Sequence, residues 1–75
     1  MRVKTKIFGS LQQYTKNKEM IFDIAEGKSI AAIKKIVGIP ENVPAGIVVN
    51  GKLANENDIV KNNDEILFIM LVGGG

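Results

Sequence analysis

The feature that most restricts the fold of this chain is an uninterrupted apolar run, "ILFIMLV", at residues 66–72. Its seven residues are far fewer than the roughly 20 needed to cross a bilayer, so the run does not predict a membrane helix. Alternate side chains of a β-strand point to opposite faces of the sheet, and this strand would be apolar on both faces. That property is typical of a strand in the middle of a sheet. We therefore expect a sheet with residues 66–72 in its interior.

Two segments near the N-terminus alternate between apolar and polar residues, as half-buried strands do. Residues 2–8, "RVKTKIF", direct one side to the core and place basic residues on the other, solvated side. Residues 19–24, "EMIFDI", follow a polar connection with the spacing of a single helical turn, and they predict an antiparallel return. The predicted core-facing residues of the two strands are Val3, Thr5, Ile7, Met20, Phe22 and Ile24.

Residues 25–40, "AEGKSIAAIKKIVGIP", have the three- and four-residue apolar spacing of a helix that buries one side. Ser29 can cap its N-terminus with the hydroxyl oxygen, and Gly38 together with Pro40 ends it. Lys34 and Lys35 lie near its C-terminus, where the helix dipole favours positive charge. The predicted core stripe of this helix consists of Ile30, Ile33, Ile36 and Val37.

The second half of the chain contains two turn signals. Asn50-Gly51 lies between apolar segments and predicts a type I′ hairpin, in which both central residues have positive φ. In "NNDE", Asn62 or Asn63 can adopt a left-handed conformation before the final strand. The elements together predict an α+β fold, in which a mixed sheet of four to five strands packs on one main helix. The first and last strands should lie parallel at its centre.

Composition limits the chemistry that this chain can perform. Its 75 residues are enough for one domain with one modest core. The absence of Cys and His excludes thiol nucleophiles, disulfides and zinc sites with these ligands. The remaining carboxylates and lysines form no calcium loop, no phosphate-binding glycine loop and no paired acid and base. We therefore expect neither side-chain catalysis nor a bound cofactor or metal.

Charge and targeting signals narrow the partners further. Ten basic and eight acidic residues give a net charge of +2, and the few aromatic residues form no aromatic and basic stripe, so nucleic-acid binding is not favoured. The N-terminus, "MRVKTKIF", lacks the apolar core of a signal peptide. We expect a cytoplasmic protein.

The chain ends in three glycines, Gly73, Gly74 and Gly75. We expect residues 1–72 to form the folded domain and residues 73–75 to form a flexible tail. Without Cβ atoms the tail is thin enough to enter a narrow channel. A carboxylate on Gly75 would be anionic at neutral pH and could attack a phosphate of ATP. The alternative is a frayed terminus without a function.

The last strand also predicts a docking surface. The helix can cover only one face of the sheet, and we assign Ile66 and Phe68 to that face. Leu67 and Ile69 would then be partly exposed on the other face, beside the lysines of the first strand. An apolar patch with a basic rim is typical of a protein-binding surface, and ordinary surface residues are the alternative. The predicted docking surface consists of Leu67, Ile69, Lys4 and Lys6.

Several segments together resemble one family. These are the terminal "GGG" after an apolar strand, "VVNGKLA", the turn "NNDEI", and "FGSLQQYT" after the first strand. With the predicted order of elements, they resemble the MoaD/ThiS family of ubiquitin-like sulfur carriers over essentially the whole chain. The resemblance implies a β-grasp, ubiquitin-like fold. It also implies a carrier or non-catalytic small subunit that reacts through its own C-terminus.

The resemblance further implies the chemistry and the partners. In this family an activating enzyme adenylates the terminal glycine with ATP and magnesium, and a sulfur donor enzyme converts it to a thiocarboxylate. A larger catalytic subunit or another biosynthetic enzyme then receives the sulfur. Carried over, Gly75 is the modified residue, and Gly73 and Gly74 are threaded into the partner. Two features depart from the family pattern. Gly73 stands where the family commonly has a small or polar residue, and "NNDE" replaces the usual Gly-Asp of the turn.

Several functions remain compatible with these features. The segment "FGSLQQYT" resembles the small subunit of molybdopterin synthase, which favours sulfur donation in molybdopterin biosynthesis. A carrier for thiamin or another pathway, or a protein modifier that joins Gly75 to a lysine amine, would need the same fold and tail. A β-grasp module that binds proteins or nucleic acid without tail chemistry is the alternative of a different class.

Overall fold

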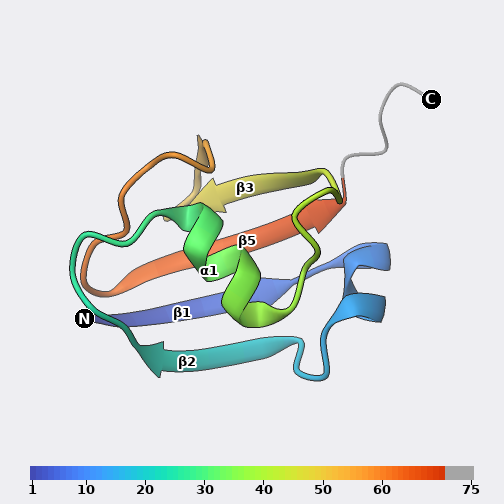
Figure 1. The fold of residues 1–75 in the computed structure, drawn as a ribbon, viewed down its shortest axis with the longest axis horizontal. Coiled ribbons are helices and arrows are strands. Elements are labelled where there is room, and N and C mark those ends of the chain that lie inside the picture. The colour runs from blue at the N-terminus through green and yellow to red at the C-terminus, as the bar shows by residue number, and fades with distance from the viewer. Residues whose placement is uncertain (71–75) are drawn as a thin grey trace.

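The structure, a computed structural model, describes residues 1–70. One α-helix lies across a twisted sheet of five strands (Figure 1). This is the predicted α+β arrangement. The elements along the chain are β1 (Arg2–Ile7), the 3₁₀ helix η1 (Gly9–Tyr14), β2 (Glu19–Asp23), α1 (Ile30–Val37), β3 (Ala45–Val49), β4 (Lys52–Ala54) and β5 (Asp64–Met70).

The strand order in the sheet is β2-β1-β5-β3-β4. The doubly apolar last strand is therefore the central one, as predicted. β1 and β5 are parallel neighbours, while the β1–β2, β3–β5 and β3–β4 pairs are antiparallel. β5 begins at Asp64, before the predicted start at residue 66, and the last two residues of the predicted strand lie outside the described residues.

The core lies between α1 and the inner face of the sheet. Alternation along each strand sets which side chains enter it: Val3 and Ile7 of β1, and Ile66 and Phe68 of β5, are fully or almost fully buried. Thr5 shares this face and is fully buried, and its Oγ1 has no hydrogen-bond partner within the described residues. The predicted residues Met20, Phe22 and Ile24 pack against the core while partly exposed.

The helix begins and ends where the sequence predicts. The N–H of Ala32 donates to Oγ of the Ser29 cap over 3.4 Å. Gly38 ends the helix in a left-handed conformation with φ of 100°. A Cβ atom at Gly38 would lie 3.0 Å from the carbonyl oxygen of Tyr14, so this position also lets η1 approach the end of the helix.

The predicted core stripe of the helix is wrong at one position. Ile36 is 51% exposed, and Lys34 is buried in its place. At 3.6 residues per turn, position 34 lies closer than position 36 to the line through Ile30, Ile33 and Val37. Geometry, not residue type, therefore decides which side chain turns inward.

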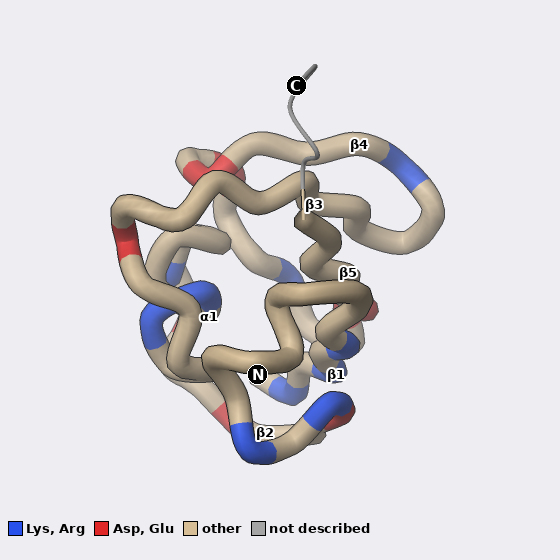
Figure 2. Tube along the Cα trace, turned by 90° about the vertical axis from the view of Figure 1, so that its right-hand side faces the viewer, with Lys and Arg blue, Asp and Glu red and all other residues tan. Residues whose placement is uncertain are grey.

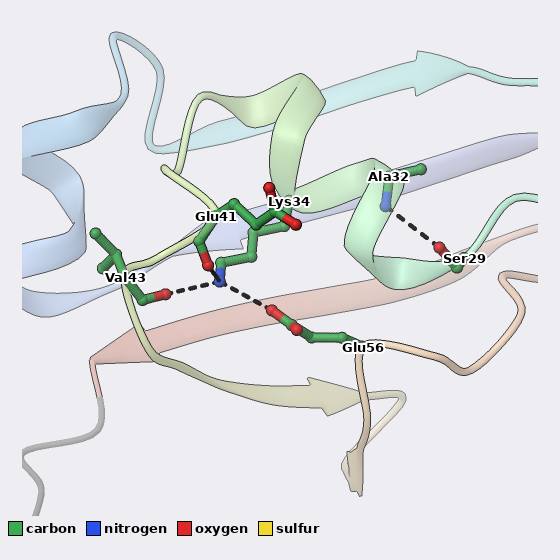
Figure 3. A network of polar contacts seen from close by, with 6 residues as sticks. All are labelled: Ser29, Ala32, Lys34, Glu41, Val43 and Glu56. Atoms are coloured by element: carbon green, nitrogen blue, oxygen red, sulfur yellow. Dashed lines mark hydrogen bonds and ion pairs between the residues drawn. The ribbon is translucent and has the colours of Figure 1, made fainter.

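The buried charge of Lys34 is compensated by three acceptors (Figure 3). Its Nζ donates to the carbonyl oxygen of Val43 over 2.7 Å, to Oε1 of Glu56 over 2.8 Å and to the carbonyl oxygen of Glu41 over 3.5 Å. A buried ammonium is tolerated when it is paired and hydrogen-bonded in this way. Lys34 thereby joins α1 to the loop before β3 and to the segment after β4.

Candidate functional site

The predicted reactive residues lie beyond the end of the described chain. Met70, the last described residue, pairs with Ala45 at the end of β5. Gly73, Gly74 and Gly75 lie outside the described residues. The sheet therefore fixes the place from which residues 71–75 continue, which is the end of its central strand.

All four residues of the predicted docking surface lie on the outer face of the sheet, opposite α1. Leu67 is half-buried and Ile69 is 37% exposed. In the parallel register of β1 with β5, Lys6 is directly beside Leu67, whereas Lys4 is beside Glu65. The structure thus brings Lys6 and Leu67 together and places Lys4 one step further from the apolar residues.

Sequence analysis missed three apolar neighbours of this surface. Val48 is the register partner of Leu67 on β3, and Leu53 is in turn the partner of Val48 on β4. Leu53 is 87% exposed. Phe8, which follows β1 and is 45% exposed, adds a third apolar side chain. The hairpin signal Asn50-Gly51 could have indicated Leu53, because a two-residue turn fixes the cross-strand pairs. We call Phe8, Val48, Leu53, Leu67 and Ile69 the apolar patch.

The charged part of the outer face is mixed and not purely basic. Nζ of Lys6 lies 3.6 Å from Oε1 of Glu19 and 3.9 Å from Oε1 of Glu65. Nε of Arg2 lies 3.8 Å from Oδ1 of Asp23. Figure 2 shows basic and acidic positions side by side around β1 and β2. Pairs of this kind, in which the carboxylate is largely exposed, are weak.

Two of the sequence motifs meet at the other end of β5. Nδ2 of Asn50 donates to Oδ1 of Asp64 over 2.8 Å, and the N–H of Glu65 donates to Oδ1 of Asn50 over 2.9 Å. The N–H of Lys61 donates to Oδ2 of Asp64 over 2.8 Å. Asn50 and Asn63 both have positive φ, at 52° and 68°, as the turn signals predict. This cluster fixes the start of β5, at the opposite end of the strand from Met70.

The described residues offer little other chemistry. Among residues 1–70, no group of three or more His, Cys, Asp or Glu side chains is placed to hold a metal ion. In the same part of the chain, no helix is long and apolar enough to cross a membrane. Lys34, the most buried cation, already uses its ammonium group within the fold.

Comparison with known proteins yields one family. The model of the ThiS family matches residues 5–75, which is nearly the whole chain. No curated protein matches the sequence.

Solved structures with the same fold come from archaea and bacteria. SAMP1 from Haloferax volcanii aligns with a TM-score of 0.74 at 17% identity, over 100% of both chains. A chain proposed to be subunit 1 of molybdopterin converting factor from Pyrococcus furiosus aligns with a TM-score of 0.72 at 22% identity, over 95% of this chain and 98% of that one. A chain in the complex of subunits 1 and 2 of molybdopterin-converting factor from Helicobacter pylori aligns with a TM-score of 0.65 at 23% identity, over 100% of both chains. At these identities the structures establish a shared fold, which is the ubiquitin-like β-grasp.

Proposed function

The chain belongs to the ThiS family of ubiquitin-fold sulfur carriers, and from this premise we propose that it carries sulfur as a thiocarboxylate on Gly75 for molybdopterin biosynthesis. The observation that carries the proposal is the extent of the family match, which runs through residue 75 and includes all three glycines. The fold supplies a rigid body, and the reacting group belongs to the backbone.

The proposed reaction has two steps on the Gly75 carboxyl group. A carboxylate oxygen attacks the α-phosphorus of ATP on an activating enzyme that uses magnesium, which forms a mixed anhydride with AMP and releases pyrophosphate. Sulfide delivered by a sulfur donor enzyme then attacks the acyl carbon, and AMP leaves. The product is a thiocarboxylate. With no Cys in the chain, no side-chain thiol competes for the activated acyl group.

In this proposal, Gly73 and Gly74 allow the C-terminus to enter the active site of the partner. A segment without Cβ atoms can pass through a channel that would exclude larger side chains. The Gly75 carbonyl can then reach a reactive centre enclosed in the partner. Neither glycine takes part in bond making, so substitutions there should slow the reaction through steric exclusion.

The apolar patch and the neighbouring Lys4 and Lys6 are the proposed docking surface for both the activating enzyme and a larger catalytic subunit. The patch lies on the face of the sheet opposite the core, and it includes Leu67 and Ile69 of β5, the strand that precedes the tail in the sequence. A partner seated on this face would contact the strand from which the tail continues in the sequence. The Helicobacter pylori match is itself a chain in a complex of subunits 1 and 2 of molybdopterin-converting factor, which supports a larger subunit as partner.

A second candidate is a protein modifier, in which the activated Gly75 forms an isopeptide bond with a lysine amine of a target protein. The similarity to SAMP1, described for the same organism as small archaeal modifier protein 1, favours it. A thiamin-type carrier uses the same tail chemistry with a different acceptor. These candidates differ in the final acceptor of the acyl group or its sulfur.

The test is the intact mass of the chain after incubation with candidate activating enzymes, ATP, magnesium and a sulfide donor. We expect the mass increase of one oxygen replaced by sulfur. The untreated sample also shows whether Gly75 is the last residue of the mature chain, which the proposal requires. A chain without Gly74 and Gly75 is the control, and it should remain unmodified.

The acceptor of the sulfur is tested by adding candidate acceptors to the thiocarboxylate form of the chain. Addition of a molybdopterin synthase large subunit and its precursor should return the carrier to its original mass and form the dithiolene product. An adduct with lysine-containing proteins would favour the modifier instead. No change in mass with any activating enzyme would contradict the carrier function itself.

A further inference from the structure

The strand β2 forms an edge of the sheet with a free row of backbone groups. Within the described residues it pairs with β1 alone, at one end of the strand order (Figure 1). The N–H of Ile7 donates to the carbonyl oxygen of Lys18, and the N–H of Ile24 donates to that of Met1, both over 2.8 Å. In an antiparallel pair the bonding direction alternates along the strand. The N–H and C=O groups of Glu19, Ile21 and Asp23 therefore point away from β1.

β2 carries at least one apolar side chain on each face of the sheet at this edge. Ile21 is 63% exposed on the outer face. Met20 and Phe22 pack against the core on the inner face but are only partly buried. A strand added beside β2 would cover all three, so it would bury apolar area in addition to forming backbone hydrogen bonds.

The charged side chains beside Ile21 determine which strand can pair with β2. Glu19 and Asp23 lie on the same outer face, two residues before and two residues after Ile21. Their side chains are 63% and 76% exposed. If a second copy of β2 paired here with Ile21 opposite Ile21, acidic residues would lie opposite acidic residues in either strand direction. Like charges directly opposite destabilise a strand pair, and opposite charges stabilise it.

We propose that the free edge of β2 binds an extended segment of another protein as an additional strand. The segment carries Lys or Arg on both sides of an apolar residue on one face and apolar residues on the other face. Its basic residues face Glu19 and Asp23, and its central apolar residue faces Ile21. A second copy of this chain with its Ile21 opposite Ile21 does not fit the charge pattern. The proposal goes beyond the carrier function, because it involves neither the tail nor the apolar patch.

The test uses a synthetic peptide with blocked ends, Thr-Lys-Val-Ile-Val-Lys-Thr, titrated into the ¹⁵N-labelled chain. We expect the largest chemical-shift changes at the amides of Glu19, Ile21 and Asp23. Thr-Glu-Val-Ile-Val-Glu-Thr should bind about tenfold more weakly, because two attractive cross-strand pairs become repulsive. Thr-Val-Lys-Ile-Lys-Val-Thr has the composition of the first peptide and should lose binding, because its lysines would face the core side.

Substitutions in the chain test whether the peptide binds at the edge of the sheet formed by β2. The double variant Glu19→Lys/Asp23→Lys should reverse the preference and bind the acidic peptide better. The control Glu26→Lys/Glu41→Lys changes the net charge equally at exposed sites outside β2, and it should keep the original preference. Ile21→Pro removes a backbone donor that faces the free edge and no ladder bond to β1, so it should weaken binding while β1 remains paired.

The outcomes separate this proposal from the carrier function. Removal of Gly73, Gly74 and Gly75 should leave peptide binding unchanged while it abolishes the gain of sulfur. No binding by the basic peptide would overturn the proposal, as would equal binding by all three peptides or shift changes confined to the apolar patch. An unchanged preference in Glu19→Lys/Asp23→Lys would also overturn it.

Discussion

The two faces of β5 are nearly alike in sequence and differ in their surroundings. Ile66 and Phe68 have no exposed surface beneath α1, while Leu67 and Ile69 on the other face are half-buried and 37% exposed. One helix covers one face only. The comparison shows that the surroundings, and not the residue type, make the two faces different. The inner face supplies folding free energy, and the docking role of the outer face is the proposal made above for the apolar patch.

The strongest test of this comparison is removal of the largest inner side chain. Phe68→Ala should lower the free energy of unfolding by about 4 kcal/mol, because it removes a fully buried ring and leaves a cavity. Urea unfolding followed by circular dichroism measures the loss. Ile69→Ala on the outer face is the control, and it should cost about 1 kcal/mol or less. Equal losses for the two variants would show that the faces are energetically equivalent.

The second-largest expected change in stability concerns α1, the helix that covers the inner face of the sheet. Lys34→Met should lower the free energy of unfolding by about 2 kcal/mol, because the Val43 carbonyl and the Glu56 carboxylate lose their donor. Glu56 is about half exposed, so water limits the loss. The neighbouring Lys35→Met, on the exposed side of α1, should change stability by less than about 0.5 kcal/mol. A loss for Lys35→Met as large as that for Lys34→Met would contradict the anchoring role.

A substitution on the outer face should weaken the binding of a partner and leave the stability of the fold nearly unchanged. Ile69→Glu should weaken binding of the larger catalytic subunit by about tenfold or more, because it places a charge in the apolar patch. Calorimetric titration measures this change, and thermal unfolding should show little loss of stability. Ile36→Glu introduces the same charge at another exposed isoleucine, on α1. If both variants bound equally well, the docking surface would have to lie elsewhere.

The smallest expected effect is a gain on the inner face. Thr5→Val replaces a buried hydroxyl without a partner by a methyl group of similar size, and it should stabilise the fold by about 1 kcal/mol. Denaturant unfolding of both proteins measures the difference. Thr15→Val is the matched control, because the Thr15 hydroxyl donates to the carbonyl oxygen of Asn17, and this substitution should bring no gain. Destabilisation by Thr5→Val would indicate that the hydroxyl has a partner in solution.

Much of the fold could be predicted because its signals are local. Alternation in residues 2–8 assigned the inner and outer positions correctly, and in the last strand it separated the two faces, since the pleat reverses at every residue. Ser29, Gly38 and Asn50-Gly51 marked a helix start, a helix end and a hairpin turn through backbone rules that hold in any fold. These residues needed no knowledge of distant neighbours.

The candidate site was predicted in part for the same reason. Alternation separated Leu67 and Ile69 from Ile66 and Phe68, and the closeness of Ile66 and Phe68 to the preceding turn assigned that second pair to the core. Val48, Leu53 and Phe8 were missed because their places on the outer face depend on strand order and register, which link residues far apart in the sequence. The partial neutralisation of Lys6 by Glu19 and Glu65 was missed on the same account.

The amino-acid sequence was sufficient to define the elements, the two-sided central strand and the three glycines that follow it. Packing determined the rest: it buried Lys34 and exposed Ile36, joined Asn50 to Asp64, and placed β2 at an edge of the sheet formed by residues 1–70. The physical reason is that periodicity and turn chemistry act over a few residues. Burial and pairing, in contrast, are fixed when segments distant in the chain compete for the same space and the same hydrogen-bond partners.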